Sequence, residues 1–479
     1  MRYSPMTTDL YELTMIAGYL KEGMEAQQAT FDLYFRTNPF QGGYAVFAGL
    51  EPALEALADL RFDEDELAYL AGLGLFDNDF ITFLRDFRFR GSVVAPPEGT
   101  VVFANEPLLT VTGTLAETQL VETMLLNTIN FQTLVATKAA RICHAAAGRE
   151  VIEFGLRRAQ GPDGGLSAAR AACVGGAVGT SNVLAGMRFD LPVRGTHAHS
   201  WVQAFSDELS AFQAYADAFP DNTVLLVDTY DTLKSGVPNA IIVARRLRQR
   251  GHELRGIRLD SGDLAYLSRE ARGMLDEADF PEVRILASNE LDETVIDSIR
   301  DEGGRVDSYC VGTRLVTAAG VGGVALGGVY KLVAIEGEPK MKITSDIAKA
   351  TLPGVKQVLR VMDADGRFIQ DVICLAKKKG GVVAGDTVYD PTNPLRHTTL
   401  PALSQVQDLR GVVMTDGQRS HDPETLAVMA ERCRQEMRLL PVGTLRFVNP
   451  HRYKVSISER LKDLRDELLN TVHIGRNRP

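Results

Sequence analysis

The sequence lacks several features that define well-known protein classes. Its five cysteines are widely separated and form no CxxC pair, which argues against a zinc ribbon, a redox dithiol or a disulfide framework. We therefore expect reduced thiols. No apolar run reaches the length that spans a membrane, and the segment MRYSPMTTDLYELTM lacks the basic and then apolar pattern of a signal peptide. We therefore expect a cytoplasmic protein with no membrane partner.

An excess of positive charge is also absent. The chain has 62 acidic and 52 basic residues and a net charge of −10, which argues against a nucleic-acid partner but allows a local basic pocket for a small anion. A hydrophobic content of 45% and a charged content of 24% are typical of globular proteins. A length of 479 residues exceeds one ordinary domain.

Short apolar segments alternate with amphipathic ones from about residue 150 to about residue 335. The expected strands are residues 149–156, 191–198, 223–229, 254–260, 283–289, 306–313 and 328–335. The stretches between them, such as 237–251 and 263–278, predict helices. This alternation indicates parallel βα units and predicts a (β/α) barrel.

The rest of the chain has a different pattern. Residues 1–135 combine helix signals with short strands, and strand signals return after residue 335, which predicts a mixed, largely antiparallel domain built from both sides of the barrel. The expected boundaries are 1–135 for the first part of this domain, 136–335 for the barrel, 336–400 for the strands that complete the domain, and 401–479 for a helical C-terminal region.

Polar residues gather at the predicted strand ends. Together with two glycines, they are Arg157, Arg158, His197, His199, Asp228, Asp231, Arg258, Asp260, Ser261, Gly262, Asp263, Ser288, Asn289, Gly312, Thr313 and Arg314. Because barrel enzymes place their chemistry at the carboxyl ends of the strands, arginines, hydroxyls and glycines there favour an anionic, phosphorylated substrate. Helix capping is the alternative for some of them, above all for the DSGD stretch at 260–263.

Two motifs suggest other functions. The stretch GTHAHSW at 195–201 places His197 and His199 one residue apart, as in metal-dependent hydrolases of the barrel class. Such a site needs further histidines at later strand ends, and the other six are not predicted there; packing without chemistry is the remaining alternative. The glycine-rich GVGGVALGG at 320–328 is followed by a strand, whereas a dinucleotide site needs a helix.

At these same motifs the chain resembles the nicotinate phosphoribosyltransferase family. The resemblance extends from about residue 8 to about residue 360 and includes TDLYELTM, EFGLRRAQGPDGGLSAARAA, GGAVGTSN, GTHAHSW, IRLDSGDL, ILASNELDE and VGTRLVT, in this order. It implies the fold of type II phosphoribosyltransferases, an irregular (β/α) barrel joined to an α/β sandwich domain. It also implies a dimer with shared active sites.

The resemblance implies that nicotinate and 5-phosphoribosyl 1-pyrophosphate give nicotinate mononucleotide and pyrophosphate, a salvage step toward NAD. ATP hydrolysis would be coupled through a phosphorylated histidine, which matches His199. The implied substrate-binding residues are Tyr11 and Phe154 around the pyridine ring, Thr196 and Arg258 on nicotinate, and Arg157, Gly312 and Thr313 on phosphate. His197 departs from the apolar residue expected at its position.

The chemistry of the reaction adds further roles. Positive charge on the ribosyl ring needs a carboxylate, for which Asp260 or Asp228 is a candidate. Mg²⁺ would neutralise pyrophosphate, with Asp260 and Asp263 as candidate contacts. Ser288 is a further substrate-binding candidate, and Asp228, Asp231 and Asp260 are options for orienting His199. Nicotinamide or quinolinate phosphoribosyl transfer and a metal-dependent hydrolase are the alternative functions. An acid after GT would favour nicotinamide, and the chain has His197 there.

Overall fold

The computed structural model describes residues 3–322, 324–342, 351–376, 381–393, 395–402 and 404–476. The chain forms two compact units. A mixed-sheet unit comprises residues 1–134 and 325–479, and a parallel-sheet unit comprises residues 135–324. Helix α6 (Glu122–Ala145) contributes residues to both. No helix within the described ranges is long and apolar enough to cross a membrane.

The mixed-sheet unit is built around two large sheets. The first, in the order β12-β11-β1-β5-β3-β18-β19, contains β1 (Gln28–Phe35), β3 (Ser92–Ala95), β5 (Leu109–Thr114), β11 (Gly328–Ile335), β12 (Glu338–Pro339), β18 (Gly411–Thr415) and β19 (Gln418–Arg419). The second, in the order β16-β15-β20-β14-β13-β17, contains β13 (Lys356–Met362), β14 (Phe368–Leu375), β15 (Thr387–Tyr389), β16 (His397–Thr399), β17 (Gln405–Asp408) and β20 (Lys454–Ser458). Strands β2 (Ala45–Val46) and β4 (Val101–Val102) form a small pair.

The helices of this unit are α1 (Leu10–Lys21), α2 (Leu50–Ala58), α3 (Glu64–Gly72), α4 (Asn78–Asp86), α5 (Leu115–Leu120), α15 (Leu426–Leu439) and α16 (Glu459–Arg476). Helix α5 packs on β1 and β5 and helix α16 packs on β14, β15 and β20, because the apolar faces of the sheets need cover, whereas α3 and α4 pack on each other. Strand β1 is buried along almost its whole length, since it lies between β5 and β11 and pairs antiparallel with both. The region 401–479, expected to be helical, thus contains strands β17 to β20 as well as two helices.

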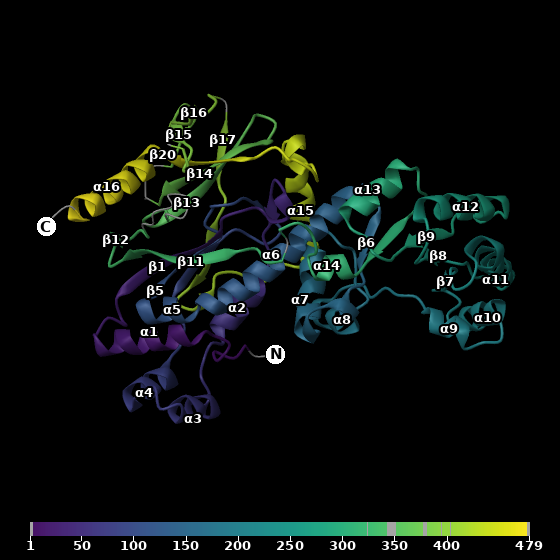
Figure 1. Ribbon diagram of the computed structural model, residues 1–479, viewed down its shortest axis with the longest axis horizontal. Helices are drawn as coiled ribbons and strands as arrows, with labels where there is room; N and C mark the ends of the chain where they lie inside the picture. Colours follow the sequence, from purple (N-terminus) through teal and green to yellow (C-terminus); the bar gives the residue numbers. More distant parts are fainter. Residues whose placement is uncertain are drawn as a thin grey trace. The chain divides into compact units, whose positions relative to one another are not determined.

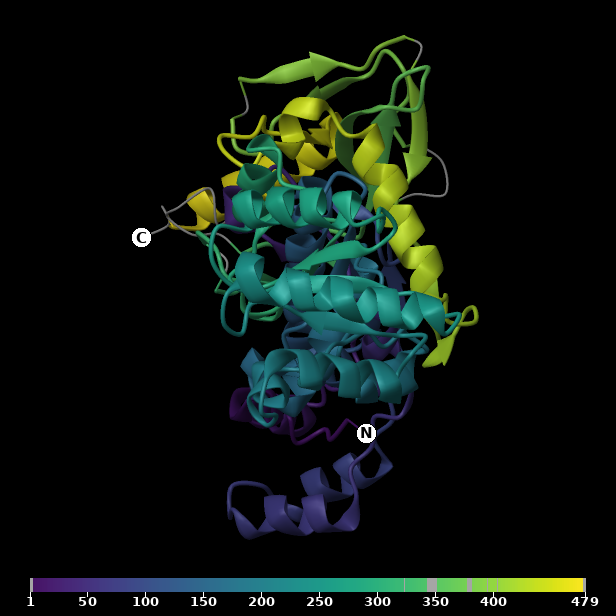
Figure 2. The same ribbon diagram turned by 90° about the vertical axis from the view of Figure 1, so that its right-hand side faces the viewer.

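The parallel-sheet unit has five parallel strands in the order β6-β10-β9-β8-β7. They are β6 (Glu150–Glu153), β7 (Val224–Leu226), β8 (Gly256–Leu259), β9 (Arg284–Ala287) and β10 (Ser308–Val311). The helices are α7 (Gly161–Val174), α8 (Val183–Phe189), α9 (His199–Gln203), α10 (Glu208–Ala218), α11 (Val237–Gln249), α12 (Leu264–Glu277), α13 (Glu293–Asp301) and α14 (Thr313–Val316). Within this unit, helices α11 and α12 lie beside strands β7 to β9 (Figure 1), and the teal helices pack side by side over the strands in Figure 2.

The five-stranded sheet continues through isolated parallel bridges. Glu153 pairs with Thr180, and Thr180 pairs with Val193. The mixed α/β fold is therefore confirmed, and the open ring of parallel segments agrees with an irregular barrel, but one strand prediction and one assignment of a strand to the barrel were wrong. Residues 191–198 contain one bridge and no strand, because the pairing with Thr180 ends at the backbone N–H of Arg194 and no further bridge follows in the described residues 195–198. The stretch 328–335 is the strand β11, but it belongs to the mixed-sheet unit, where it pairs with β1, and not to the barrel.

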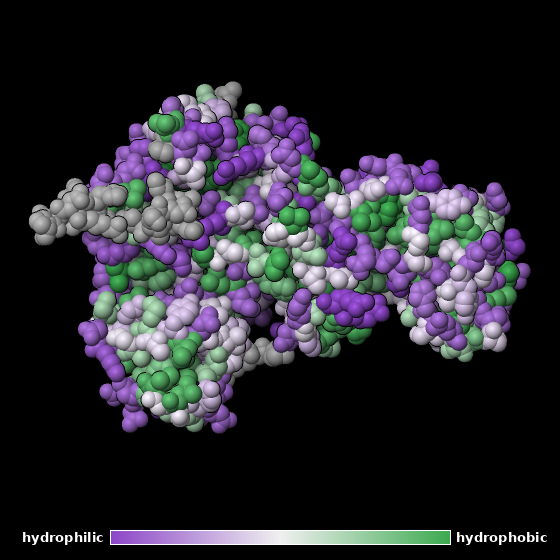
Figure 3. All heavy atoms as spheres, viewed as in Figure 1, coloured by the Kyte–Doolittle hydropathy of each residue, from purple (hydrophilic) through white to green (hydrophobic). Residues whose placement is uncertain are grey.

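Hydrophilic residues cover most of the face shown in Figure 3, with smaller hydrophobic areas between them. This surface agrees with the globular composition of the sequence. The glycine-rich stretch 320–328, of which residue 323 lies outside the described residues, leads directly into β11. No helix begins there, so the structure supports the expectation that it is not a dinucleotide-binding turn.

Candidate active site

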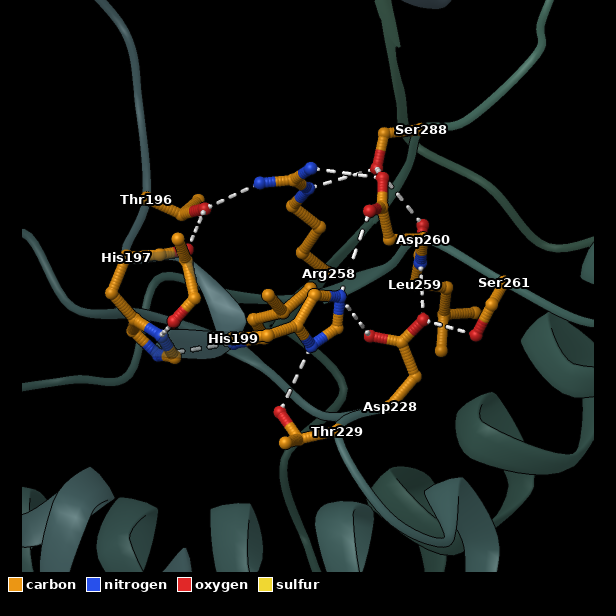
Figure 4. Close-up of polar contacts among 12 residues, drawn as sticks. Thr196, His197, His199, Asp228, Thr229, Arg258, Leu259, Asp260, Ser261 and Ser288 are labelled. Atoms are coloured by element: carbon orange, nitrogen blue, oxygen red, sulfur yellow. Dashed lines mark hydrogen bonds and ion pairs between the residues drawn. The ribbon is translucent and has the colours of Figure 1, made fainter. Parts of the chain in front are cut away.

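The candidate active site lies at the carboxyl ends of β7, β8 and β9. Arg258 is in β8, Asp228 follows β7 by two residues, and Ser288 directly follows β9. Because these parallel strands are neighbours in the sheet, their ends meet at one edge. The segment that contains Thr196 and His199 reaches the same place, as Figure 4 shows.

The Arg258 guanidinium is held at all three of its nitrogens. Its Nε donates to Ser288 Oγ at 2.8 Å, Nη1 donates to Thr196 Oγ1 at 3.0 Å, and Nη2 donates to Asp260 Oδ1 at 2.9 Å. The guanidinium carbon also lies 5.7 Å from the centre of the Phe154 ring, a cation–π contact. The structure thus brings together five of the predicted residues, Phe154, Thr196, Arg258, Asp260 and Ser288. Three hydrogen bonds fix the orientation of the Arg258 guanidinium.

His199 faces two carboxylates. Its Nε2 lies 3.7 Å from Asp260 Oδ2 and 4.0 Å from Asp228 Oδ1. Its other ring nitrogen, Nδ1, is 3.1 Å from the hydroxyl of Thr229. The side chain of His199 is 40% exposed, and Thr229 contacts the ring at Nδ1.

The two carboxylates are held differently. Asp228 is almost completely buried, and its Oδ2 accepts hydrogen bonds from the Asp260 backbone N–H at 2.9 Å and from the Ser261 hydroxyl at 2.5 Å. Its Oδ1 faces His199 and has no hydrogen-bond partner in the described part of the chain. Burial alone would raise the pKa of Asp260, but the charge of Arg258 and the Ser288 hydrogen bond outweigh burial and lower it. Asp260 is therefore ionised at neutral pH.

His197 points away from this cluster (Figure 4). Its Nε2 accepts a hydrogen bond from the Leu226 backbone N–H at 3.2 Å, and its ring packs against Tyr215, with 4.8 Å between ring centres. Burial lowers the pKa of His197 to about 4. Because Nε2 is occupied, His197 and His199 do not form a metal clamp, and no group of three or more potential metal-binding side chains occurs among the described residues.

Three other predicted residues, Asp263, Asp231 and Arg157, lie at helix starts or in a turn. Asp263 is the N-cap of α12 and accepts from the Tyr266 N–H at 2.9 Å, as the capping alternative predicted. Asp231 similarly caps the short π-helix Thr232–Gly236. Arg157 is exposed in the 3₁₀ turn Leu156–Arg158. The roles proposed for these residues stay predictions.

The remaining predicted site residues are Gly312, Thr313 and Tyr11. Gly312 precedes α14, which begins at Thr313, and a Cβ on Gly312 would lie 3.1 Å from the Phe154 carbonyl oxygen. A side chain there would therefore require the Phe154 backbone to shift slightly, and glycine allows the close approach without that shift. Tyr11 belongs to α1 of the mixed-sheet unit and is 45% exposed.

Sequence reasoning missed Thr229. The predicted orienting partners of His199 are all carboxylates, whereas the structure places the Thr229 hydroxyl at Nδ1 and the carboxylates at Nε2. The sequence contains a signal for this contact, because Thr229 follows Asp228 at the end of a predicted strand, where hydroxyl groups favour an anionic substrate.

Three sequence profiles match most of the chain. The profile described as the nicotinate phosphoribosyltransferase N-terminal domain matches residues 6–130, the one for the nicotinate phosphoribosyltransferase family matches residues 150–300, and the one for its C-terminal domain matches residues 355–465. The central profile includes all the residues of the candidate site around Arg258 and His199.

Individual relatives agree with these profiles. The nicotinate phosphoribosyltransferase of Bacillus subtilis is 43% identical over 94% of this chain and 92% of its own length. A nicotinate phosphoribosyltransferase of Mycobacterium tuberculosis is 42% identical over 95% of this chain and 91% of its own. The crystal structure of human nicotinic acid phosphoribosyltransferase superposes with a TM-score of 0.85 at 34% identity, over 96% of this chain and 99% of that one.

Proposed function

The chain belongs to the nicotinate phosphoribosyltransferase family, and we propose that it joins nicotinate to 5-phosphoribosyl 1-pyrophosphate, giving nicotinate mononucleotide and pyrophosphate. The observation that carries this proposal is the fixed Arg258 guanidinium beside Phe154, at the carboxyl edge of the parallel strands. A planar cation next to an aromatic ring suits a small aromatic carboxylate such as nicotinate. The product would enter NAD salvage.

The second part of the proposal is coupling to ATP through a phosphorylated His199. A nucleophilic histidine needs one free ring nitrogen and a partner that orients the other. His199 supports both requirements, since its side chain is partly exposed and its Nδ1 contacts Thr229. Asp228 and Asp260 would stabilise the positive charge that develops on the imidazole ring as Nε2 forms a bond.

The carboxylates of Asp228 and Asp260 also suit the transfer of the phosphoribosyl group. Displacement of pyrophosphate builds positive charge on the ribosyl ring, which an ionised Asp260 or the buried Asp228 would stabilise. Magnesium takes few protein carboxylates and keeps several waters, so the unpartnered Oδ1 of Asp228 together with Asp260 fits such an ion, with Asp263 as a further candidate. When bound, it would neutralise the charge of the pyrophosphate group.

A homodimer with shared active sites is also proposed. The support is the exposed aromatic ring of Tyr11 on α1, together with membership of the family. The cytoplasmic location stays a prediction from the sequence.

The substrate is tested by mononucleotide formation from nicotinate and from nicotinamide, each with 5-phosphoribosyl 1-pyrophosphate and Mg²⁺, with and without ATP. We expect nicotinate to be used in preference, and ATP to stimulate the reaction. Nicotinamide is the alternative substrate, and its equal or better use would overturn the proposal. Arg258 supports the acid, because a cation attracts a carboxylate more strongly than a neutral amide.

The phosphohistidine is tested by incubation with γ-labelled ATP. We expect the label on the protein to be stable in base and lost in acid, and to be absent from His199→Asn. His252→Asn is the matched control, because His252 also lies beside an aspartate, with its Nδ1 2.8 Å from Asp221 Oδ1, but away from the carboxyl ends of the strands. Full labelling of the His199 variant would contradict the assignment.

A further inference from the structure

The strands of the parallel-sheet unit and the bridged segments at Thr180 and Val193 form an incomplete ring. Its ends, the segment 194–198 and strand β7, are not joined by backbone pairing among the residues described, and we call this gap the junction. From β7 the ladder continues through β8, β9, β10 and β6, and then through the bridges to Thr180 and Val193. Beyond Val193, no backbone hydrogen bond joins residues 194–198 to β7 within the described chain. The backbone that presents Thr196 and His199 therefore needs another connection to β7.

A side chain provides that connection. The backbone N–H of Leu226, the last residue of β7, donates to His197 Nε2 at 3.2 Å. A backbone N–H can only donate, so Nε2 carries no proton, and the neutral ring carries its proton on Nδ1. Nδ1 lies 3.3 Å from the carbonyl oxygen of Ala198. Both ring nitrogens therefore have partners, and neither points to the candidate active site.

The ring of His197 is also fixed by packing. It is 7% exposed and lies edge-on to Tyr215, with Phe212 at 5.9 Å between ring centres. Burial among aromatic rings disfavours a charged imidazole, and the Leu226 bond needs the unprotonated Nε2. A neutral imidazole in a single tautomer is the form that this environment stabilises.

We propose that His197 is a positioning residue, whose imidazole replaces the missing backbone pair between residues 194–198 and β7 and thereby aligns Thr196 and His199 with the end of β7. The inference rests on the proposed function. Thr196, one residue before His197, bonds Arg258, and His199, two residues after it, contacts Thr229. Leu226 lies two residues before Asp228. One hydrogen bond thus connects the two backbones that present the nicotinate-binding and the phosphate-accepting groups.

The test compares three variants. His197→Leu fills the space but removes the acceptor. His197→Gln keeps an acceptor, because its side-chain oxygen can reach the place of Nε2. Phe212→Leu is the matched control, since it removes an aromatic contact of the same ring and leaves the Leu226 bond in place. Thermal melting of each variant shows that the compared proteins are folded.

We expect His197→Leu to raise the KM for nicotinate about tenfold, the size of one lost buried hydrogen bond, and to raise it by more than it lowers kcat. We expect His197→Gln to return the KM to within about threefold of the wild type, as an alternative acceptor would. A KM for His197→Leu equal to the wild-type value would overturn the inference. So would an equal rise in Phe212→Leu, because packing alone would then explain the effect.

Amide hydrogen exchange at Leu226 separates this inference from the proposed function. We expect exchange to be slow in the wild type and in His197→Gln, and faster in His197→Leu. A wild type that makes no mononucleotide from nicotinate would defeat the proposed function, and the Leu226 exchange rates would still show whether His197 closes the junction. Unchanged exchange in His197→Leu would overturn the inference whatever the activity.

Discussion

Each unit of the molecule contains an arginine bound to an aspartate, and the two clusters differ in what surrounds them. In the mixed-sheet unit, Arg360 binds both oxygens of Asp371, through Nε at 3.1 Å and Nη2 at 2.7 Å. Glu436 and the Val101 carbonyl accept its remaining hydrogen bonds, and Tyr453 donates to Asp371 at 3.0 Å. The side chains of Arg360 and Asp371 are 3% and 0% exposed.

Arg258 and Asp260 form the open counterpart in the parallel-sheet unit. Arg258 is also hydrogen-bonded at every nitrogen, but Asp260 is 28% exposed and its Oδ2 faces the partly exposed His199. In the first cluster, every polar partner belongs to the protein and aromatic rings cover the guanidinium, with Phe368 at 4.3 Å. The second cluster leaves polar atoms that a ligand can use. Equal pairing of the arginine therefore does not distinguish a structural cluster from a functional one, whereas exposure of its neighbours does.

The largest expected effect is on protein stability, through the closed cluster around Arg360 in the mixed-sheet unit. Arg360→Met would leave Asp371 and Glu436 buried without their cation, and removing one partner of a buried ion pair costs about 3–5 kcal/mol. We expect the free energy of unfolding, measured in urea, to fall by this amount. Arg258→Met is the comparison, and it should lower stability by less because water can reach Asp260. A loss below about 1 kcal/mol in Arg360→Met would show that the closed cluster is not structural.

The open cluster should respond in activity instead. Arg258→Gln removes the cation proposed to bind the nicotinate carboxylate, and a hydrogen bond to a charged group contributes about 2 kcal/mol, or about 30-fold in kcat/KM. We expect a loss of this size with nicotinate and a smaller loss with nicotinamide, measured by mononucleotide formation.

The control is Arg248→Gln in the same unit. Arg248 pairs with the exposed Glu253 and Asp279 and lies outside the site. Its kcat/KM should equal the wild-type value. Equal losses for nicotinate and nicotinamide in Arg258→Gln would contradict a direct contact of Arg258 with the carboxylate.

Local patterns predicted much of this arrangement. The amphipathic stretches 237–251 and 263–278 are α11 and α12, because their apolar spacing matches a helix. Arg258, Asp260 and Ser288 meet because carboxyl ends of neighbouring parallel strands share an edge.

What the sequence did not reveal depends on contacts between distant segments. β11 has the composition of a barrel strand, yet its partner is β1, and nothing local encodes that pairing. Residues 191–198 look like a strand, but a histidine side chain rather than the backbone completes the junction with β7. The closed cluster around Arg360 was also not predicted, because its members come from separate parts of the chain.

The smallest expected effect concerns acid, to which the two clusters should respond in opposite directions. In the closed cluster, Arg360 binds Asp371 and Glu436, and the buried Glu106 lies close enough to interact with Asp371. Burial and the nearby charge of Asp371 raise the pKa of Glu106 well above its usual value, so this cluster favours a bound proton. In the open cluster, Arg258 and Ser288 overcome burial and lower the pKa of Asp260, so this cluster favours the ionised form.

Stability measured in urea between about pH 7 and about pH 2, a range that extends below the usual pKa of an aspartate, tests this contrast, each wild-type value being compared with that of a variant that cannot titrate. A raised pKa means that the contribution of Glu106 is present at low pH and is lost as the pH rises through its folded-state pKa. Relative to Glu106→Gln, the wild type should therefore gain stability as the pH falls. A lowered pKa means the reverse for Asp260, so relative to Asp260→Asn the wild type should lose stability as the pH falls through the folded-state pKa. If both differences had the same sign, the two clusters would not differ electrostatically, and exposure alone would separate them.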